Sequence, residues 1–207
     1  MSPATQATQV LRIAEQRGLV RSRDLTEAGI PRATLMRLVR AGRLKQIARG
    51  LYALPAQPLS RQHTLAELAA RSSRGVFCLL TALHFHGLLR RPPDEVWLAI
   101  PNKARAPRGD APPLRVLRFS GPALTEGVER YVIDGVTVRI YSVAKTVADC
   151  FKFRDRIGLD VAVKALRTCR RERRASDAEL RHCAQRCRVL GVMRPYLDGC
   201  VPAAPDR

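Results

Sequence analysis

The residues best suited to chemistry in this sequence are arginines spaced along one short segment. Residues 31–41 are predicted to form a helix, in which Pro31 suits the first turn and Gly42 the C-terminal cap. At 100° per residue, Leu35 and Leu38 fall on one apolar face, whereas the opposite face carries arginines and no acid. A helix that lies against phosphates and base edges needs such a face. The candidate contacts along it are Arg32, Ala33, Thr34, Arg37 and Arg40.

The charge of the whole chain favours the same kind of partner. Among 207 residues, 37 are Lys or Arg and 18 are Asp or Glu, so the formal net charge is +19. An arginine-rich genomic bias would give a similar count, but a surface this positive favours polyanions, with nucleic acid first. From Arg32 to Pro55 every charged residue is basic.

The segments around this helix predict the element that positions it. Residues 5–17 and 22–28 have helical patterns, and a two-residue turn separates the second from Pro31. Residues 44–47 and 51–53 are strand-like and flank a loop that contains Gly50. We therefore predict a winged helix-turn-helix over residues 1–54, against the alternative of a small helical domain with a solvated basic face. The wing would add Arg43, Lys45 and Arg49 to the DNA contacts.

A second domain is predicted after a proline-containing linker at 55–59. Residues 60–202 combine helical patterns at 60–71, 76–86, 142–153, 159–171 and 176–190 with strand patterns at 95–100, 114–119, 128–133 and 136–141. Asp134-Gly135 between the last two strands predicts a hairpin. The expected fold class is α+β: the winged helix-turn-helix is followed by a mixed α/β domain with a small, mainly antiparallel sheet flanked by helices.

The second domain offers few groups for catalysis. Lys145 and Asp149 lie four residues apart on one predicted helix, where they could form an acid–base pair, a phosphate clamp or an ordinary salt bridge. His84 and His86 would point about 200° apart on a helix, so one metal ion could not easily reach both. No acid stands two residues before any lysine, as a Pro-Asp…(Asp/Glu)-x-Lys nuclease site would require. We expect no enzyme activity, no metal and no cofactor.

A second basic cluster lies near the C-terminus. Arg170, Arg171, Arg173 and Arg174 surround a single acid, Glu172. Such a run commonly marks a solvated helix end. It is equally compatible with a surface for phosphates, an RNA or an acidic partner.

Three stretches of the chain resemble the AbiEi-type antitoxins of bacterial type IV toxin–antitoxin systems. Residues 42–52 resemble the G-x-L-x-x-x-x-R-G-x-Y wing of that family. Residues 78–88 are similar to its C-L-x-S-A-L-x-x-H-G-L stretch, with Thr81 in place of the commoner Ser, and residues 141–151 to its Y-S-x-x-K-T-x-x-D-x-F stretch. The resemblance implies a protein that represses its own operon by binding inverted repeats in promoter DNA and counteracts a nucleotidyltransferase toxin.

Further expectations concern partners and location. One winged helix reads one half-site, so two copies would bind an inverted repeat, either as a weak dimer or as monomers that pair on DNA. The sequence shows no signal-peptide pattern and no apolar run near the ~20 residues of a membrane helix, so we expect a cytoplasmic protein with no membrane contact. A DNA-binding regulator without a toxin partner and an RNA-binding module remain as alternatives.

Overall fold

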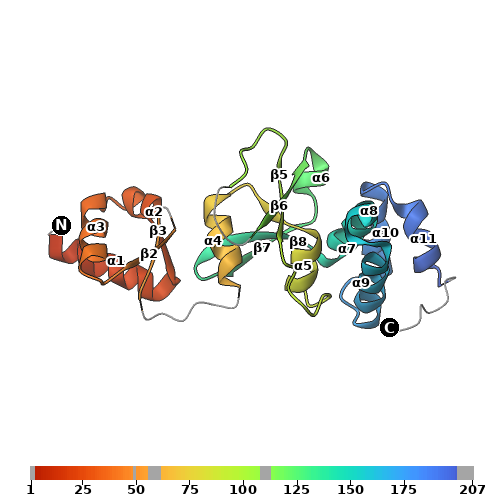
Figure 1. Cartoon of the computed structure of the whole chain (residues 1–207), viewed down its shortest axis with the longest axis horizontal. Helices are drawn as coiled ribbons and strands as arrows, with labels where there is room; N and C mark the ends of the chain where they lie inside the picture. Colours follow the sequence, from red (N-terminus) through yellow and green to blue (C-terminus); the bar gives the residue numbers. More distant parts are fainter. Residues whose placement is uncertain (1–2, 49, 56–61, 108–112, 200–207) are drawn as a thin grey trace. The chain divides into compact units, whose positions relative to one another are not determined.

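The computed structural model describes residues 3–48, 50–55, 62–107 and 113–199 (Figure 1). Contacts between residues divide the chain into two compact units. Unit 1 contains Met1–Ser73 together with Arg130–Val138, and unit 2 contains Arg74–Glu129 together with Arg139–Arg207. The linker expected at 55–59 lies almost entirely outside the described residues, so the domain boundaries at 54 and 60 stay predictions.

Unit 1 begins with three helices and a three-stranded antiparallel sheet in the order β1-β3-β2. Leu19 of β1 and Lys45 of β2 both pair with Ala53 of β3, so β3 is the central strand. The elements are α1 (Pro3–Arg17), β1 (Leu19–Arg21), α2 (Ser22–Glu27), α3 (Arg32–Arg40), β2 (Lys45–Ala48), β3 (Leu51–Ala53) and α4 (His63–Arg71). The three helices and the hairpin had been predicted from the sequence, whereas no strand had been predicted at β1.

The ends of α3 follow directly from its sequence. Pro31 is the N-cap residue, one position before the helix proper. At the other end Gly42 has φ +66°, its N–H bonds the Val39 carbonyl, and the Arg43 N–H bonds the Leu38 carbonyl. This is the Schellman pattern, which glycine favours because it adopts a positive φ without steric cost. The predicted glycine cap of this helix is confirmed.

The Asp134-Gly135 turn, which joins β7 (Val128–Ile133) to β8 (Val136–Tyr141), contacts the C-terminal end of α1. The Leu19 N–H donates to the Asp134 carbonyl at 3.2 Å. Gly135 has φ +71°, and a Cβ added there would lie 2.0 Å from the carbonyl oxygen of Arg17. Only a residue without a side chain fits this approach.

Gly135→Ala should therefore destabilise the protein more than Gly29→Ala, which is the matched control. Gly29 has nearly the same φ, +72°, but nothing lies within 4 Å of the added carbon. We expect Gly29→Ala to cost about 1 kcal/mol through backbone strain alone. Gly135→Ala should cost at least about 1 kcal/mol more, because backbone atoms must move. Urea unfolding of the two variants measures the difference, and equal midpoints would show that the tip does not pack against α1.

The second sheet has five strands in the order β6-β5-β4-β8-β7. It is mixed, because β5 pairs in parallel with β6 and β4 in parallel with β8, whereas β4 and β5 are antiparallel. The prediction of a mainly antiparallel sheet was wrong. The strands are β4 (Val76–Phe77), β5 (Val96–Pro101), β6 (Leu114–Phe119), β7 (Val128–Ile133) and β8 (Val136–Tyr141).

Strand β4 is where the sequence-based prediction failed. Residues 76–86 were predicted as one helix, but Val76 and Phe77 form a strand in the middle of the sheet. The helix α5 begins only at Leu79, which has φ +44°. A short, continuous apolar run fits a buried strand and a buried helix equally well, and periodicity does not separate them.

Helices complete the second unit. Helix α7 lies deepest, because every residue from Ala144 to Phe151 is buried, and it packs against α5, α9 and α10. Ser142 caps the start of α7, and Ser176 and Glu179 form a capping box at the start of α10. The helices are α5 (Leu79–Phe85), α6 (Pro122–Thr125), α7 (Val143–Lys152), α8 (Arg154–Ile157), α9 (Leu159–Arg171), α10 (Asp177–Arg186) and α11 (Leu190–Leu197). Within the described ranges, no helix has the length and apolar character needed to cross a bilayer.

Candidate nucleic-acid interface

Helix α3 is anchored by its apolar side and leaves its basic side open. Leu35 and Leu38 are 1% and 6% exposed and belong to a core that also contains Val10 of α1. The exposed positions of α3 are Arg32, Ala33, Arg37 and Arg40. The core therefore fixes the orientation of the helix about its own axis. In this orientation the three arginines of α3 lie on its exposed face.

Thr34 does not belong to this face. It is only 4% exposed, and its hydroxyl donates to Gln6 Oε1 of α1 at 3.3 Å. The cause is helical geometry, because Thr34 lies four residues before Leu38 and therefore one turn away on the inner side. The structure gives Thr34 a role in joining α3 to α1, and its predicted contact with a base is not available in this arrangement.

The β2–β3 hairpin carries further basic residues. Lys45 in β2 and Arg43 just before it are both exposed. The pairing shifts between Gln46 and Ala48, which is an irregularity close to the turn. Arg49 lies outside the described residues, so its predicted place at the wing tip stays a prediction.

The sequence segment that contains α3 and the hairpin has no acidic residue of its own. The sequence contains no Asp or Glu between Glu27 and Glu67. Among the residues that the structure describes, Arg32, Arg40, Arg43 and Lys45 form no ion pair with a carboxylate. Exposed basic groups without acidic partners attract a polyanion most strongly.

The C-terminal cluster differs from α3 in this respect. Arg170 binds both carboxylate oxygens of Asp177 at 3.0 Å and also the Leu197 carbonyl, and Arg171 pairs with Glu172 at 3.2 Å. Arg173 and Arg174 are exposed. Arg170 therefore joins α9 to α10 and to the end of α11, and the charge of Arg171 is partly offset by Glu172, which leaves a weaker basic surface than that of α3.

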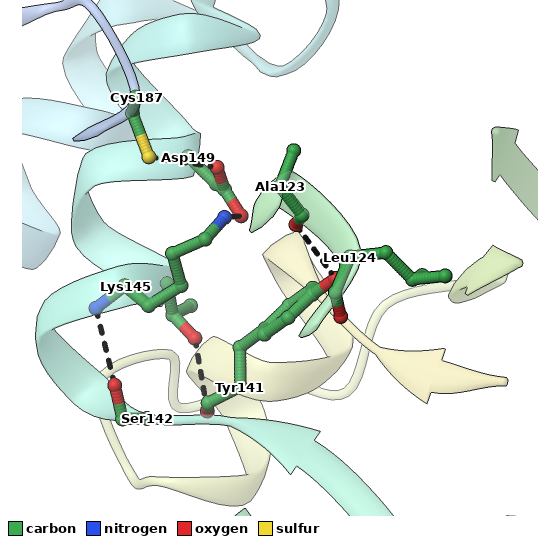
Figure 2. Close-up of polar contacts among 8 residues, drawn as sticks. Ala123, Leu124, Tyr141, Ser142, Lys145, Asp149 and Cys187 are labelled. Carbon is green, nitrogen blue, oxygen red and sulfur yellow. Dashed lines mark hydrogen bonds and ion pairs between the residues drawn. The ribbon is translucent and has the colours of Figure 1, made fainter. Parts of the chain in front are cut away.

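Lys145 and Asp149 form a buried ion pair on α7 (Figure 2). Their exposed fractions are 3% and 1%. The ring of Tyr141 lies 4.5 Å from Lys145 Nζ, and the Cys187 thiol donates to the second carboxylate oxygen at 3.3 Å. The Tyr141 hydroxyl in turn donates to the carbonyls of Ala123 and Leu124 at 3.1 Å. This network connects β8, α6, α7 and the end of α10.

The electrostatics of this network favour a fixed ion pair. Burial is the largest single influence and lowers the pKa of Lys145, but the charge of Asp149, its hydrogen bond to Lys145 and the nearby thiols together outweigh burial, so the pKa lies above its ordinary value. Burial, followed by the charge of Asp149, raises the pKa of the Cys187 thiol to about 12, so this cysteine stays protonated as a donor. A covered pair with fixed charges holds elements together, and both groups are closed off from an outside phosphate.

The histidines and cysteines have separate partners. His86 is buried and its Nε2 lies 2.8 Å from the Tyr141 carbonyl, whereas His84 is exposed and its Nδ1 lies 2.9 Å from the Leu89 carbonyl. In the described part of the chain, no group of three His, Cys, Asp or Glu side chains could hold a metal ion.

One segment of the chain matches a known family model. Residues 9–55 match the family model described as transcriptional regulator, AbiEi antitoxin. This AbiEi segment runs from within α1 to the end of β3 and includes every candidate DNA contact. Among solved structures, the RV2827C protein from Mycobacterium tuberculosis is similar in fold, with a TM-score of 0.52 and 22% identity over 87% of this chain and 71% of that one. No curated protein matches the chain.

Proposed function

We propose that this chain is a DNA-binding transcriptional regulator in which α2, α3 and the β2–β3 hairpin act as a winged helix-turn-helix. The observation that carries the proposal is the exposed, acid-free basic face of α3 beside a basic hairpin, within the segment that matches AbiEi regulators. A helix of this kind enters the major groove while the adjacent hairpin contacts the backbone.

The candidate contacts take different roles. Arg37 and Arg40 project from the middle and end of α3, where they can reach base edges. Arg32 at the helix start and Arg43, Lys45 and Arg49 around the hairpin would bind phosphates, which fix position but carry no sequence information. One chain reads one half-site, so an inverted repeat in the promoter would bind two copies that pair on DNA or as a weak dimer.

The biological role that we propose is that of a type IV antitoxin. The chain would repress its own operon in the cytoplasm and counteract a nucleotidyltransferase toxin without catalysing a reaction itself. The family match at residues 9–55 supports the regulator and antitoxin class. A nucleotidyltransferase reading frame beside this gene, together with rescue of toxin-expressing cells by the chain, would support the complete role. A lone gene would leave a regulator without a toxin.

Duplex binding is tested with the DNA upstream of the gene. In a gel shift, the full chain should bind this duplex at least about 10³-fold more tightly than a scrambled duplex, which is the low end of specificity for such proteins. A structured RNA of equal length is the third probe. Tighter binding to the RNA than to either duplex would contradict the proposal.

Lys45→Ala should weaken binding to operator and scrambled duplex by the same factor. Because a phosphate contact releases counterions, its loss should reduce the slope of log K against log salt by about one unit. Lys103→Ala is the matched control, since Lys103 is an exposed lysine in unit 2. Loss of preference for the operator in Lys45→Ala would mean that Lys45 reads a base.

A further inference from the structure

Unit 1 contains a pocket that the proposed DNA contacts do not use. It lies between β1, the start of α2, the beginning of β3 and the end of α4, and its volume is about 160 Å³. The lining residues are Arg21, Ser22, Arg23, Gly50, Leu51, Ala70 and Arg71.

The chemistry of this lining is that of an anion site. Three of the lining residues are arginines, and none is Asp or Glu. Arg71 is held in place by Glu67, at 2.7 Å from Nη2 to Oε1. Arg23 touches Asp24 only at 3.4 Å and is largely exposed. Guanidinium groups that converge on one space are the preferred protein ligands of phosphate oxygens.

Two donors in the pocket have no partner of their own. Within the described ranges, neither the half-buried Arg21 guanidinium nor the Ser22 hydroxyl forms a hydrogen bond or an ion pair. Burial, and then the like charge of Arg23, lowers the pKa of Arg21. The charged form of Arg21 is therefore destabilised, and a nearby anion would stabilise it.

The backbone keeps the pocket open at its hairpin side. The Ser22 N–H donates to the Gly50 carbonyl at 2.9 Å, which joins the start of α2 to the start of β3. A Cβ at Gly50 would lie 3.0 Å from Ser22 Oγ, and the φ of Gly50 is +74°. Glycine at this position therefore leaves the serine hydroxyl accessible.

We propose that the pocket formed by Arg21, Ser22, Arg23 and Arg71 binds a phosphate group. Guanidinium N–H groups and the serine hydroxyl donate to its oxygens, and the charge of the anion is balanced by Arg21. Two sources supply this chemistry: a backbone phosphate of bound DNA, which rests on the proposed function, or a free phosphate ion, which does not.

The first arm of the test uses inorganic phosphate and the full chain. Isothermal titration at constant ionic strength, with chloride as the reference anion, should show one phosphate bound per chain. Arg21→Gln should weaken this binding at least about tenfold, since a hydrogen bond to a charged group is lost. Arg23→Gln should weaken it less, and its exposed side chain makes the fold insensitive to the change. Arg12→Gln, an exposed arginine of α1 outside the pocket, should leave it unchanged.

The second arm measures duplex binding by the same variants as salt is varied. A fall of about one unit in the salt slope for Arg21→Gln identifies the DNA backbone as the source. Phosphate binding that is lost while the slope is unchanged identifies a free phosphate. The proposal is overturned if Arg21→Gln matches Arg12→Gln in both arms. Should the wild-type chain bind no duplex at all, the proposed function fails, and the phosphate arm alone decides the pocket.

Discussion

Replacing Lys145 by methionine should lower the free energy of unfolding by about 3–5 kcal/mol. The change keeps most of the side-chain volume but leaves the Asp149 carboxylate buried without its cation, and Asp149 is only 1% exposed. The Cys187 thiol donates one bond to that carboxylate but brings no positive charge. Urea unfolding followed by circular dichroism measures the loss.

Two control variants separate charge from packing. Lys145→Met combined with Asp149→Leu removes both charges and should be more stable than Lys145→Met alone, because no uncompensated ion remains. Arg171→Met breaks the exposed pair with Glu172, where Arg171 is 72% exposed, and should cost under about 0.5 kcal/mol. If Lys145→Met costs no more than Arg171→Met, the buried pair does not hold unit 2 together.

The pH dependence of this contribution follows from the raised pKa of Lys145. A lysine whose pKa is higher in the folded than in the unfolded state adds stability below the unfolded pKa, about 10.4, and loses it as pH rises through the folded value. The difference between wild type and Lys145→Met should therefore stay constant up to about pH 10 and shrink above it. A difference that shrinks already near neutral pH would contradict this account.

Local signals were read correctly wherever one residue decides the conformation. Gly42 ends α3 and Asp134-Gly135 turns the β7–β8 hairpin at the predicted positions, and α7 begins within one residue of the predicted start, where Ser142 caps it. Each of these depends on a backbone angle or a cap that the residue type itself favours. Hence the AbiEi segment and the helices α7, α9 and α10 were largely predictable from the sequence, whereas α11 was not predicted.

Features that depend on distant residues were missed. Strand β4 has only two residues, and it lies between β5 and β8. Both of these partner strands follow it in the sequence, and the paired residues are more than twenty positions away. Thr34 was placed at the margin of the basic face, and only its bond to Gln6 shows that it faces inward. The contact of Lys145 with Tyr141 could have been predicted, because the two residues are four positions apart. The contact of Asp149 with Cys187 could not, because Cys187 lies just after α10 and no spacing in the sequence relates the two.

Arg37→Ala should reduce the preference of the chain for its operator over scrambled DNA. A bidentate contact between an arginine and a guanine contributes about 1–3 kcal/mol of discrimination, and an inverted repeat contains two such contacts. The preference should therefore fall by about 2–6 kcal/mol, which is at least about 30-fold. Arg37 is the residue to test because it is exposed near the centre of α3, between the buried Leu35 and Leu38 that fix the helix.

The measurement is a titration of operator and scrambled duplex at several salt concentrations. Arg37→Ala should lose at least about 30-fold of the preference for the operator, whereas Lys45→Ala should keep the wild-type preference at lower affinity. Arg12→Ala, which removes an exposed arginine of α1, should retain both affinity and preference. Because all three variants lose one positive charge, a general electrostatic effect would lower their affinities alike and leave the preference of each unchanged. That outcome would mean that α3 does not enter the major groove.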